Sequence, residues 1–571
     1  MAIYRSDQAQ LTFGTEATPG GYPELASSVT DGTGTARINM GDGLPAGSTE
    51  ITVDNFSNIT AGEFVQIGPT LSGASSGTAA NVTFESEIRK VDSVSGTTGI
   101  TLELPTSFFH ANDTDIQVVT AVSDTTKDKF ITQIPGVYET VDLPDPEMNI
   151  EPRYFLGTAS KRNFYGAYSG QQTYTGSVGS FVLLDGKPLR FPIGKVVSDC
   201  AATYTTNRTR LNGNHKKGDS WILVVDADNI AQDTYIGIDL PTALSESTTV
   251  SSVGEIRKVV TSAGSSHYLQ LDYPLQYDHT AAGSGTTQVV NLSGSGVYYT
   301  HTILETTDLD SVTWHAHMKA SNSTSSTARE NEDFDRRYFG GKIGNATISA
   351  EEGGMLTMSW DSVNFLGMIH NQKFNSNYGS GATELPFYSL METISSSDVD
   401  FPTTEPYYFS NGEVSMFGQT LARVRSFSLS VNNNEEPRYY IARQKGRRRG
   451  PSEIKENRRE YGMSVSLALP DATSSTSATA RTLFSELLLE GDYGSGKAGF
   501  NITLTFSRAT NDTITITIPD DGSAGTGGNE QGAFIRTAPH AFGTDNPYQV
   551  DADVLFRNLK ITVVDSQHYY P

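Results

Sequence analysis

The sequence contains an internal repeat, and this repeat limits how the chain can fold. The segment SEIRKVDSVSGTTGITLELP, which begins at Ser86, returns as GEIRKVVTSAGSSHYLQLDYP from Gly254. Chance alternation of apolar and polar residues would not keep later matches in the same order, so we predict two copies of a small β module, at residues 36–122 and 208–292. The later matches are His110 with His279 and Gln117-Val118-Val119 with Gln288-Val289-Val290.

A second repeat lies outside these modules. NIEPRYFLGTASKRN from Asn149 resembles NEEPRYYIARQKGRR from Asn434, and a strand pattern and a possible helix follow each copy. The helix pattern is weaker in the first half, where Gly186 and Pro188 interrupt it. In the second half, one apolar face precedes a stop at Gly491. That face consists of Ala480, Leu483, Phe484, Leu487 and Leu488.

The two repeats together predict a mainly β protein. We expect a duplicated β domain with one flanking helix per copy, and two inserted small β modules. The expected parts are an N-terminal arm (1–35), the first inserted module (36–122), the first part of domain 1 (123–207), the second inserted module (208–292), the second part of domain 1 (293–384) and domain 2 (385–571).

The charge and cysteine content exclude several classes of protein. Lys and Arg number 41 against 65 Asp and Glu, a formal charge of −24, which disfavours tight binding of duplex DNA. Cys200 is the single cysteine, so neither an intrachain disulfide nor a cysteine-based zinc site is expected. The sequence has no apolar run long enough for a signal core or a membrane span, which predicts neither export nor an anchor.

Two short motifs match catalytic or nucleotide-binding patterns, but their contexts do not. GDYGSGK, which ends at Lys497, has phosphate-loop spacing, but Ala498 stands where a magnesium-binding Ser or Thr is needed. It also follows a helix and precedes a strand, the reverse of the required order. GASSG, around Ser75, lies in a Ser/Gly-rich stretch and not in a strand-to-helix turn. We interpret both as turns or surface loops.

Two groups of titratable residues also carry no predicted chemistry. His315 and His317 share one face of a strand, but no third metal ligand can be named, so we expect exposed strand histidines. Adjacent carboxylates in a strand point to opposite faces and make poor catalytic pairs. We therefore expect the pairs Glu351-Glu352 and Glu435-Glu436 to be solvated flanks of turns.

A basic segment, ARQKGRRRGPSEIKENRRE (residues 442–460), stands out from the acidic background. Eight of the 41 basic residues lie in it, and its glycines and proline disfavour a helix or central strand. No aromatic residue alternates with the arginines, so stacking on nucleic acid bases is the weaker interpretation. We favour contact with the acidic surface of another copy, with a solvated loop as the alternative. The residues assigned to this contact are Arg447, Arg448, Arg449, Arg458 and Arg459.

The order of segments resembles that of tail tube proteins, the major tail proteins of tailed bacteriophages and archaeal viruses. The segments are GQTLARVRSFSLSVNNNEEPRYYI, YGMSVSLAL, RTLFSELLLEG, FNITLTFSR and TITITIP, with GGKIGNATISAEEGGMLTMSWDSVNFLG and PGVYETVDLPDP. The resemblance covers residues 123–200 and 293–571 and rests on pattern and order, since no short motif defines the family. It implies a β-sandwich with a flanking helix, in rings of six domains whose inner strands close into a β-barrel.

The resemblance also implies a function. We expect a structural virion protein that is not an enzyme, uses no cofactor or metal, and self-assembles into stacked rings that form the conduit for genome delivery. Because the tube domain is duplicated, three chains per ring with pseudo-sixfold symmetry are expected, with a hexamer as the alternative. The inserted modules would lie outside the barrel and be independent of it.

Partners and location follow from the same resemblance. The expected partners are other copies of the chain, the tape measure and the tail terminator, while viral DNA passes through the lumen without specific binding. The expected location is the virion tail, after synthesis in the host cytoplasm. The alternative function is a virion or cell-surface adhesion protein whose β modules bind glycans.

Overall fold

The structure is a computed structural model in which most, but not all, of the chain is described. The description covers residues 4–16, 19, 28–68, 87–102, 105–106, 108–124, 133–154, 166–200, 208–219, 221–228, 230–241, 253–263, 267–283, 287–292, 298–320, 334–370, 404–416, 419–421, 424–440, 450–468, 500–520, 532–537, 540–541 and 549–570.

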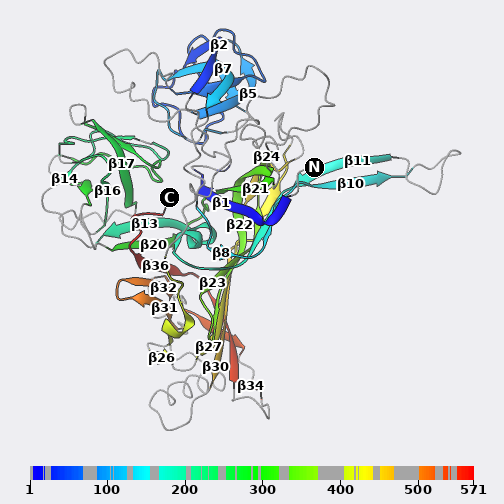
Figure 1. Ribbon diagram of the computed structural model, residues 1–571, viewed down its shortest axis with the longest axis vertical. Coiled ribbons are helices and arrows are strands. Elements are labelled where there is room, and N and C mark those ends of the chain that lie inside the picture. The colour runs from blue at the N-terminus through cyan, green and yellow to red at the C-terminus, as the bar shows by residue number, and fades with distance from the viewer. Residues whose placement is uncertain are drawn as a thin grey trace.

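The described residues form a mainly β protein, which confirms the predicted fold class (Figure 1). A 13-stranded sheet, the large sheet, runs through both halves of the chain. Its order is β33 (Phe534–Thr537), β35 (Gln549–Phe556), β30 (Glu460–Ala468), β27 (Val424–Asn432), β22 (Phe334–Glu351), β23 (Thr357–Asn364), β12 (Thr175–Val182) and β8 (Val137–Tyr138), with β1 (Tyr4–Thr15), β21 (Val312–Ala320), β24 (Gly367–His370), β34 (His540–Ala541) and β9 (Val141–Asp142) at its sides.

A seven-stranded sheet packs on one face of the large sheet, and the main core lies between them. Trp360 is at its centre, with Phe13, Phe181 and Phe191 edge-on at 5.5–5.9 Å between ring centroids. Alternation in TITITIP gives the strand predicted for it, with Ile514, Ile516 and Ile518 fully buried. The order is β13 (Gly194–Cys200), β20 (Tyr299–Glu305), β36 (Lys560–Asp565), β32 (Asp512–Ile518), β31 (Ile502–Ala509), β25 (Gly412–Met416) and β26 (Gln419–Leu421).

The same order of elements occurs twice. A hairpin precedes a strand of the large sheet, and two neighbouring strands of the second sheet follow. In the first half these are β10 (Glu147–Arg153) with β11 (Gly166–Thr173), then β12, β13 and β20; in the second they are β28 (Glu436–Arg438) with β29 (Glu453–Lys455), then β30, β31 and β32.

Helices are short in the described part of the chain. The weak helix pattern of the first half gives η2 (Lys187–Leu189) and the four-residue α1 (Arg190–Ile193), because the residues up to Val182 belong to β12. A further 3-10 turn is η3 (Phe409–Asn411). The helix predicted at residues 480–488 lies outside the described residues. No helix of the described part is long and apolar enough to cross a membrane.

The repeated EIRKV segments lie in two separate six-stranded sheets that have the same strand order. The first is β2 (Ser28–Arg37), β7 (Asp115–Asp124), β4 (Phe64–Ile67), β5 (Glu87–Ser95), β6 (Gly99–Leu102) and β3 (Glu50–Thr52). The second is β14 (Arg208–Thr209), β19 (Val289–Asn291), β16 (Tyr235–Ile238), β17 (Glu255–Ala263), β18 (Tyr268–Leu271) and β15 (Trp221–Leu223). We call them the first and second modules.

Strand register corrects one detail of the repeat. Ile67 and Ile238 both pair with the glutamate of EIR. On the other side of these strands, Ile67 lies opposite Ile116, whereas Ile238 lies opposite Val289. Val289 therefore corresponds to Ile116 in the structure and not to Val118, so the predicted Gln-Val-Val match is wrong by two positions. A two-residue shift leaves every side chain on the same face of the sheet, so the hydrophobic pattern does not detect it.

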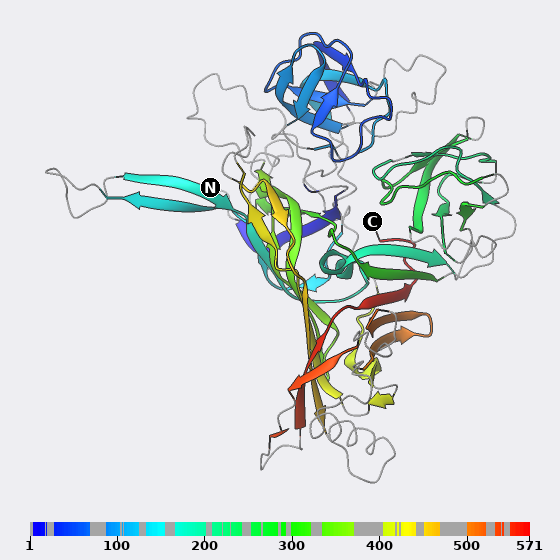
Figure 2. The same ribbon diagram turned by 180° about the vertical axis from the view of Figure 1, so that it is seen from behind.

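The C-terminal residues hold the second module against the sheets (Figures 1 and 2). Gln276 of the module and Arg190 of the body both donate to the backbone carbonyl of Tyr570, at 3.2 and 2.9 Å. Tyr569 donates to Asp272 of the module. The second module is therefore bonded to the sheets, while the expected independence of barrel assembly from the modules stays a prediction.

Candidate functional site

The face of the large sheet that turns away from the core is lined by short hydroxyl side chains. On β27, for example, Ser426, Ser428 and Ser430 alternate with the buried Phe427 and Leu429. We call this surface the hydroxyl face. Its Ser and Thr residues are Thr175, Ser177, Thr347, Ser349, Thr357, Ser359, Ser426, Ser428, Ser430 and Ser464.

Side-chain hydrogen bonds link neighbouring residues of the hydroxyl face. Ser349 and Thr357 lie 3.1 Å apart across β22 and β23. Asp361 accepts from Thr347 at 2.8 Å and from Ser359 at 2.7 Å, so a carboxylate and two hydroxyls satisfy one another. The surface is thus polar and short-chained over its central strands β22, β23 and β27. Arg425, near the start of β27, is a partly exposed cation, and it is paired with Glu352 at 3.3 Å. This face is not among the predicted sites, although the alternation in RSFSLSV contains the signal for it.

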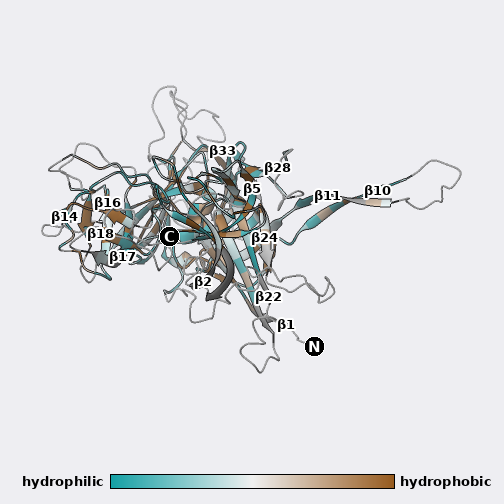
Figure 3. Ribbon diagram, turned by 90° about the horizontal axis from the view of Figure 1, so that it is seen from above, coloured by the Kyte–Doolittle hydropathy of each residue, from teal (hydrophilic) through white to brown (hydrophobic). Residues whose placement is uncertain are grey.

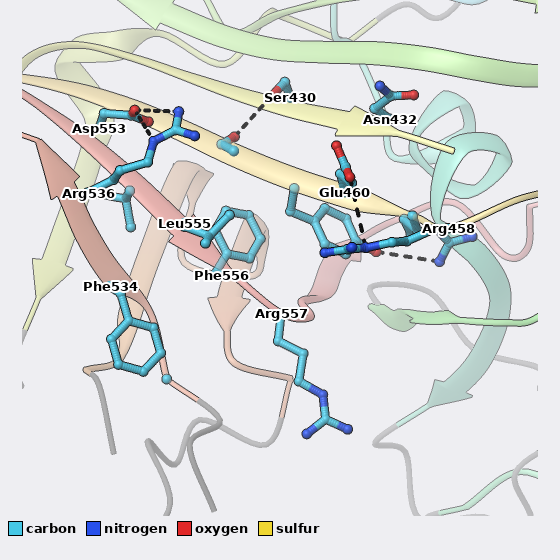
Figure 4. Close-up of a pocket in the computed structure, with 15 residues that line it drawn as sticks. Ser430, Asn432, Arg458, Glu460, Phe534, Arg536, Asp553, Leu555, Phe556 and Arg557 are labelled. Carbon is cyan, nitrogen blue, oxygen red and sulfur yellow. Dashed lines mark hydrogen bonds and ion pairs between the residues drawn. The ribbon is translucent and has the colours of Figure 1, made fainter. Parts of the chain in front are cut away.

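Basic residues gather at one edge of this face, around a hollow of about 690 Å³ (Figure 4). Arg536 of β33 donates to Asp553 of β35 at 2.7 Å. Arg458 lies 3.9 Å from Glu460, and its side chain is 87 % exposed. Leu555, which is 49 % exposed, is an apolar part of the lining. The hollow combines cations with exposed apolar surface at the β33 end of the large sheet.

The predicted contact residues of the basic segment do not share one environment. Arg447, Arg448 and Arg449 lie outside the described residues. Arg458 faces solvent beside the hollow. The assignment of all five arginines to an intermolecular contact stays a prediction.

Arg459 is bonded within its own chain. Its Nε donates to the side chain of Asn433 at 2.6 Å, and Nη1 donates to the carbonyl of Ile193 at 3.0 Å. Nη2 donates to the carbonyl of Thr306 at 3.4 Å. Arg459 thereby fixes the start of β30 to the end of α1 and to the chain after β20. The structure gives this residue a positioning role in addition to the predicted contact.

Two expectations about titratable residues are wrong. His315 and His317 lie on β21, which pairs with β1 on one side and β22 on the other. Both are buried, at 1 % and 5 % exposure, so they are not exposed strand histidines. The carboxyl oxygens of Glu435 are also buried, and this burial raises its pKa to about 8. By contrast, Glu351 and Glu352 are exposed beside the turn between β22 and β23, as predicted.

The residues shared by the two modules form buried networks and not surface sites. In the first, Glu87 lies 2.6 Å from Arg89 and 2.7 Å from His110. In the second, Glu255 lies 2.6 Å from Arg257 and 2.5 Å from His279. The arginine also donates to the carbonyl of a proline, Pro105 or Pro274. The repeated residues therefore form a buried charged network that joins β5 or β17 to the loop after the next strand. We call this network of Glu, Arg and His the clamp.

Neither the networks nor the hydroxyl face has the arrangement of a catalytic or metal centre. No cluster of three metal-ligating side chains occurs among the described residues. The GASSG and GDYGSGK motifs lie outside them. The described surface has three main features: a polar face, a basic hollow at the edge of this face, and two hairpins.

The two hairpins are the β10–β11 arm and the shorter β28–β29 hairpin. The β10–β11 arm extends far from the body, as the view from above shows (Figure 3). It carries the exposed Met148 and Ile150, at 45 % and 59 % exposure. The shorter β28–β29 hairpin lies near its base, where Tyr439 donates to the carbonyl of Gln172 at 3.0 Å. An isolated two-stranded hairpin is at best marginally stable in water, and packing against another element stabilises it.

Comparison with known protein families gives a match. The family described as phage tail tube protein matches residues 166–552, which is more than half of the chain. No curated protein matches the chain.

Proposed function

The chain belongs to the phage tail tube protein family, and from this premise we propose that it self-assembles into stacked rings that form a conduit for the viral genome. The family is structural and not enzymatic, and its place is the tail of the virion. Synthesis in the host cytoplasm, before assembly with other tail proteins such as the tape measure and the tail terminator, is part of the proposal.

The single observation that carries the proposal is the large sheet. It combines strands from both halves of the chain, because β22 pairs with β27 over seven residues, from Asn345–Asn432 to Glu351–Ser426. Its core face is covered by the second sheet, and its hydroxyl face is not covered by any described strand. A sheet of this kind can continue from chain to chain and close into a barrel that has no free edges.

The chemistry of the hydroxyl face suits a passage for DNA. Duplex DNA binds tightly where Lys and Arg neutralise its phosphates and release counterions. Serine and threonine offer neutral, short side chains, and Asp361 adds negative charge. The face would therefore let the duplex slide without holding it, which agrees with an overall formal charge of −24.

Three chains per ring are the stoichiometry that the duplication favours. The repeated order of hairpin, large-sheet strand and second-sheet pair gives each chain two equivalent parts. Three such chains would supply six parts with pseudo-sixfold symmetry, whereas six chains would supply twelve. The hexamer remains the alternative, and the inserted modules would lie outside the tube in either case.

Contact between rings is assigned to the basic segment. Arg447, Arg448, Arg449, Arg458 and Arg459 are proposed to meet carboxylates of the neighbouring ring, with Arg459 also holding the base of the segment through Asn433. Arginine suits this task because its planar guanidinium can form two parallel hydrogen bonds with one carboxylate.

Negative-stain microscopy of the purified chain tests the proposal. Uniform hollow cylinders, formed without any other tail protein, are the expected result. A chain that stays monomeric over a range of protein and salt concentrations would contradict self-assembly and favour the adhesion alternative. Glycan-array binding by the same monomer would then be the measurement to make.

A further inference from the structure

We propose that the basic hollow at the β33 edge of the large sheet receives the β8–β9 edge, residues 137–142, of a second copy of the chain. This inference rests on the proposed assembly into rings and names the two surfaces that join within a ring. The two surfaces lie at opposite ends of one sheet, since β33 begins its strand order and β8 ends it.

The hollow offers positive charge that its own chain leaves incompletely paired. Arg557 is exposed and has no carboxylate within 4 Å among the described residues (Figure 4). Arg458 has only the loose 3.9 Å contact with Glu460, and we assign it here to the contact within a ring in place of the contact between rings. Arg536, by contrast, is tightly paired with Asp553, at 2.6 Å. The hollow therefore has two cations available for a partner and one that is already neutralised.

Apolar surface lies between these cations. Leu555 is 49 % exposed on the hydroxyl side of β35, where its neighbours on the strand are the polar Asp553 and Arg557. An exposed leucine in the middle of a polar strand face is common on its own, but here it borders a hollow of about 690 Å³. A partner that fills the hollow would remove this apolar surface from water.

The β8–β9 edge has the complementary composition. Val137 is 59 % exposed, and the carboxylates of Glu139 and Asp142 also face solvent. The intervening Tyr138 turns inward, where its hydroxyl accepts from the backbone N–H of Leu11 at 2.8 Å. Strands β8 and β9 pair only with β12 among the described strands, so their outer side is an open edge.

Charge determines which edges can meet. If two β33 edges met, Arg557 and Arg458 of one chain would face the same cations of the other chain. If two β8–β9 edges met, the carboxylates of Glu139 and Asp142 would likewise face each other. When a β33 edge meets a β8–β9 edge, the arginines face the carboxylates and attract them. The same contact covers the exposed apolar side chains of Val137 and Leu555. This head-to-tail contact is heterologous, and a heterologous contact closes into a ring when its rotation allows.

Charge reversal in matched variants tests the contact. Arg458→Glu with Arg557→Glu makes the hollow acidic, and Glu139→Lys with Asp142→Lys makes the edge basic. Each double variant should lose rings in negative stain and, by roughly ten-fold or more, the fraction that sediments as assemblies, since like charges then face each other. The quadruple variant reverses both surfaces and should recover assembly.

The control is Arg37→Glu, an exposed cation of the first module, which should assemble like the wild type. All the reversed positions are exposed, and unchanged thermal unfolding of each variant would show that the chain still folds. If the wild type forms tubes and the double variants form them equally well, this contact is wrong while the tube assignment stands. Phosphate groups of nucleic acid would then be the better occupant of the hollow.

A cysteine experiment keeps the contact testable even if tubes do not form. Val137→Cys and Leu555→Cys are made in separate chains, which are mixed and oxidised; the native Cys200 is fully buried. Disulfide-linked dimers that need both variants support the contact. Their absence from the mixture, judged against each variant alone, overturns it. Absence of tubes from the wild type overturns the proposed function separately.

Discussion

His279 Nε2 lies 2.5 Å from Glu255 Oε1 in the interior of the second module. On its other side, Nδ1 lies 2.7 Å from Asp239. Burial alone would lower the pKa of the imidazole, but the two carboxylates raise the pKa to about 9. The imidazole is therefore protonated at neutral pH and donates from both nitrogens.

The stability of the second module should fall at alkaline pH. An unfolded histidine has a pKa near 6.5, so the stabilisation is complete below about pH 6.5 and is lost as the pH rises through 9. Its size is about 3 kcal/mol, because each pKa unit corresponds to about 1.4 kcal/mol. Chemical unfolding between pH 6 and 10, followed by the fluorescence of Trp221, measures it. His279→Gln should lose stability at pH 7 and flatten this dependence; a variant with the same alkaline slope as the wild type would contradict it.

The clamp arginines should be essential in both modules. Removing one partner of a buried ion pair leaves an uncompensated charge and costs about 3–5 kcal/mol. We expect this loss for Arg89→Met and for Arg257→Met, because Glu87 and Glu255 stay buried. Arg37→Met removes an exposed ion pair and should cost less than about 1 kcal/mol. Equal effects of all three substitutions on unfolding in urea would rule out the clamp.

The side chain of Tyr570 should hold the C-terminal residues on the body of the chain, and these residues in turn contact the second module. Its hydroxyl donates to Asp565 at 2.6 Å and accepts from the backbone N–H of Gly186 at 3.2 Å. Tyr570→Phe leaves these two groups without that partner, at a cost of about 1–3 kcal/mol. Deletion of residues 567–571 should loosen the module, which keeps the hydrogen bonds Tyr277–Val196 and Ser198–Gly254 to β13. Small-angle scattering would detect the loosening as an increased radius of gyration. A deletion with an unchanged scattering profile would show that other contacts suffice.

The sequence predicts the local elements better than their long-range partners. Alternation in TITITIP predicts strand β32, because burial on one face imposes a period of two. The bonds of Arg459 to the carbonyls of Ile193 and Thr306 could not be predicted, since any residue has a carbonyl. The burial of His315 depends on β1, which lies some 300 positions earlier in the chain and pairs with β21. Pairing between β22 and β27, which creates the hydroxyl face, is likewise a contact between distant segments.

A mixture of charge variants should determine the number of chains in a ring. A chain with an acidic hollow (Arg458→Glu, Arg557→Glu) can neighbour only a chain with a basic edge (Glu139→Lys, Asp142→Lys), so the two must alternate. Alternation closes a ring of six but leaves one mismatched contact in a ring of three. With three chains per ring, we expect the equimolar mixture to form far fewer closed rings than the quadruple variant. Equal ring formation by both samples would favour the hexamer.

The basic segment should control stacking between rings. Stacking acidic rings is opposed by charge repulsion, which cations at the contact offset; the chain carries −24. Each partly exposed arginine–carboxylate pair contributes only about 0.2–1 kcal/mol, but the pairs repeat around every ring. Replacing Arg447, Arg448 and Arg449 with Ser should therefore leave folded chains that form rings but short tubes.

Tube length in negative stain, recorded at increasing salt, measures this effect. Raising the salt from about 0.1 M to 1 M shortens the Debye length from about 10 Å to about 3 Å, so wild-type tubes should shorten while those of the triple variant change little. The matched control replaces Arg37, Lys216 and Lys258 with Ser, which removes the same charge from the modules. If the control and the triple variant shorten the tubes equally, net charge and not the basic segment governs stacking. Tubes of normal length from the triple variant would leave the segment as a solvated loop.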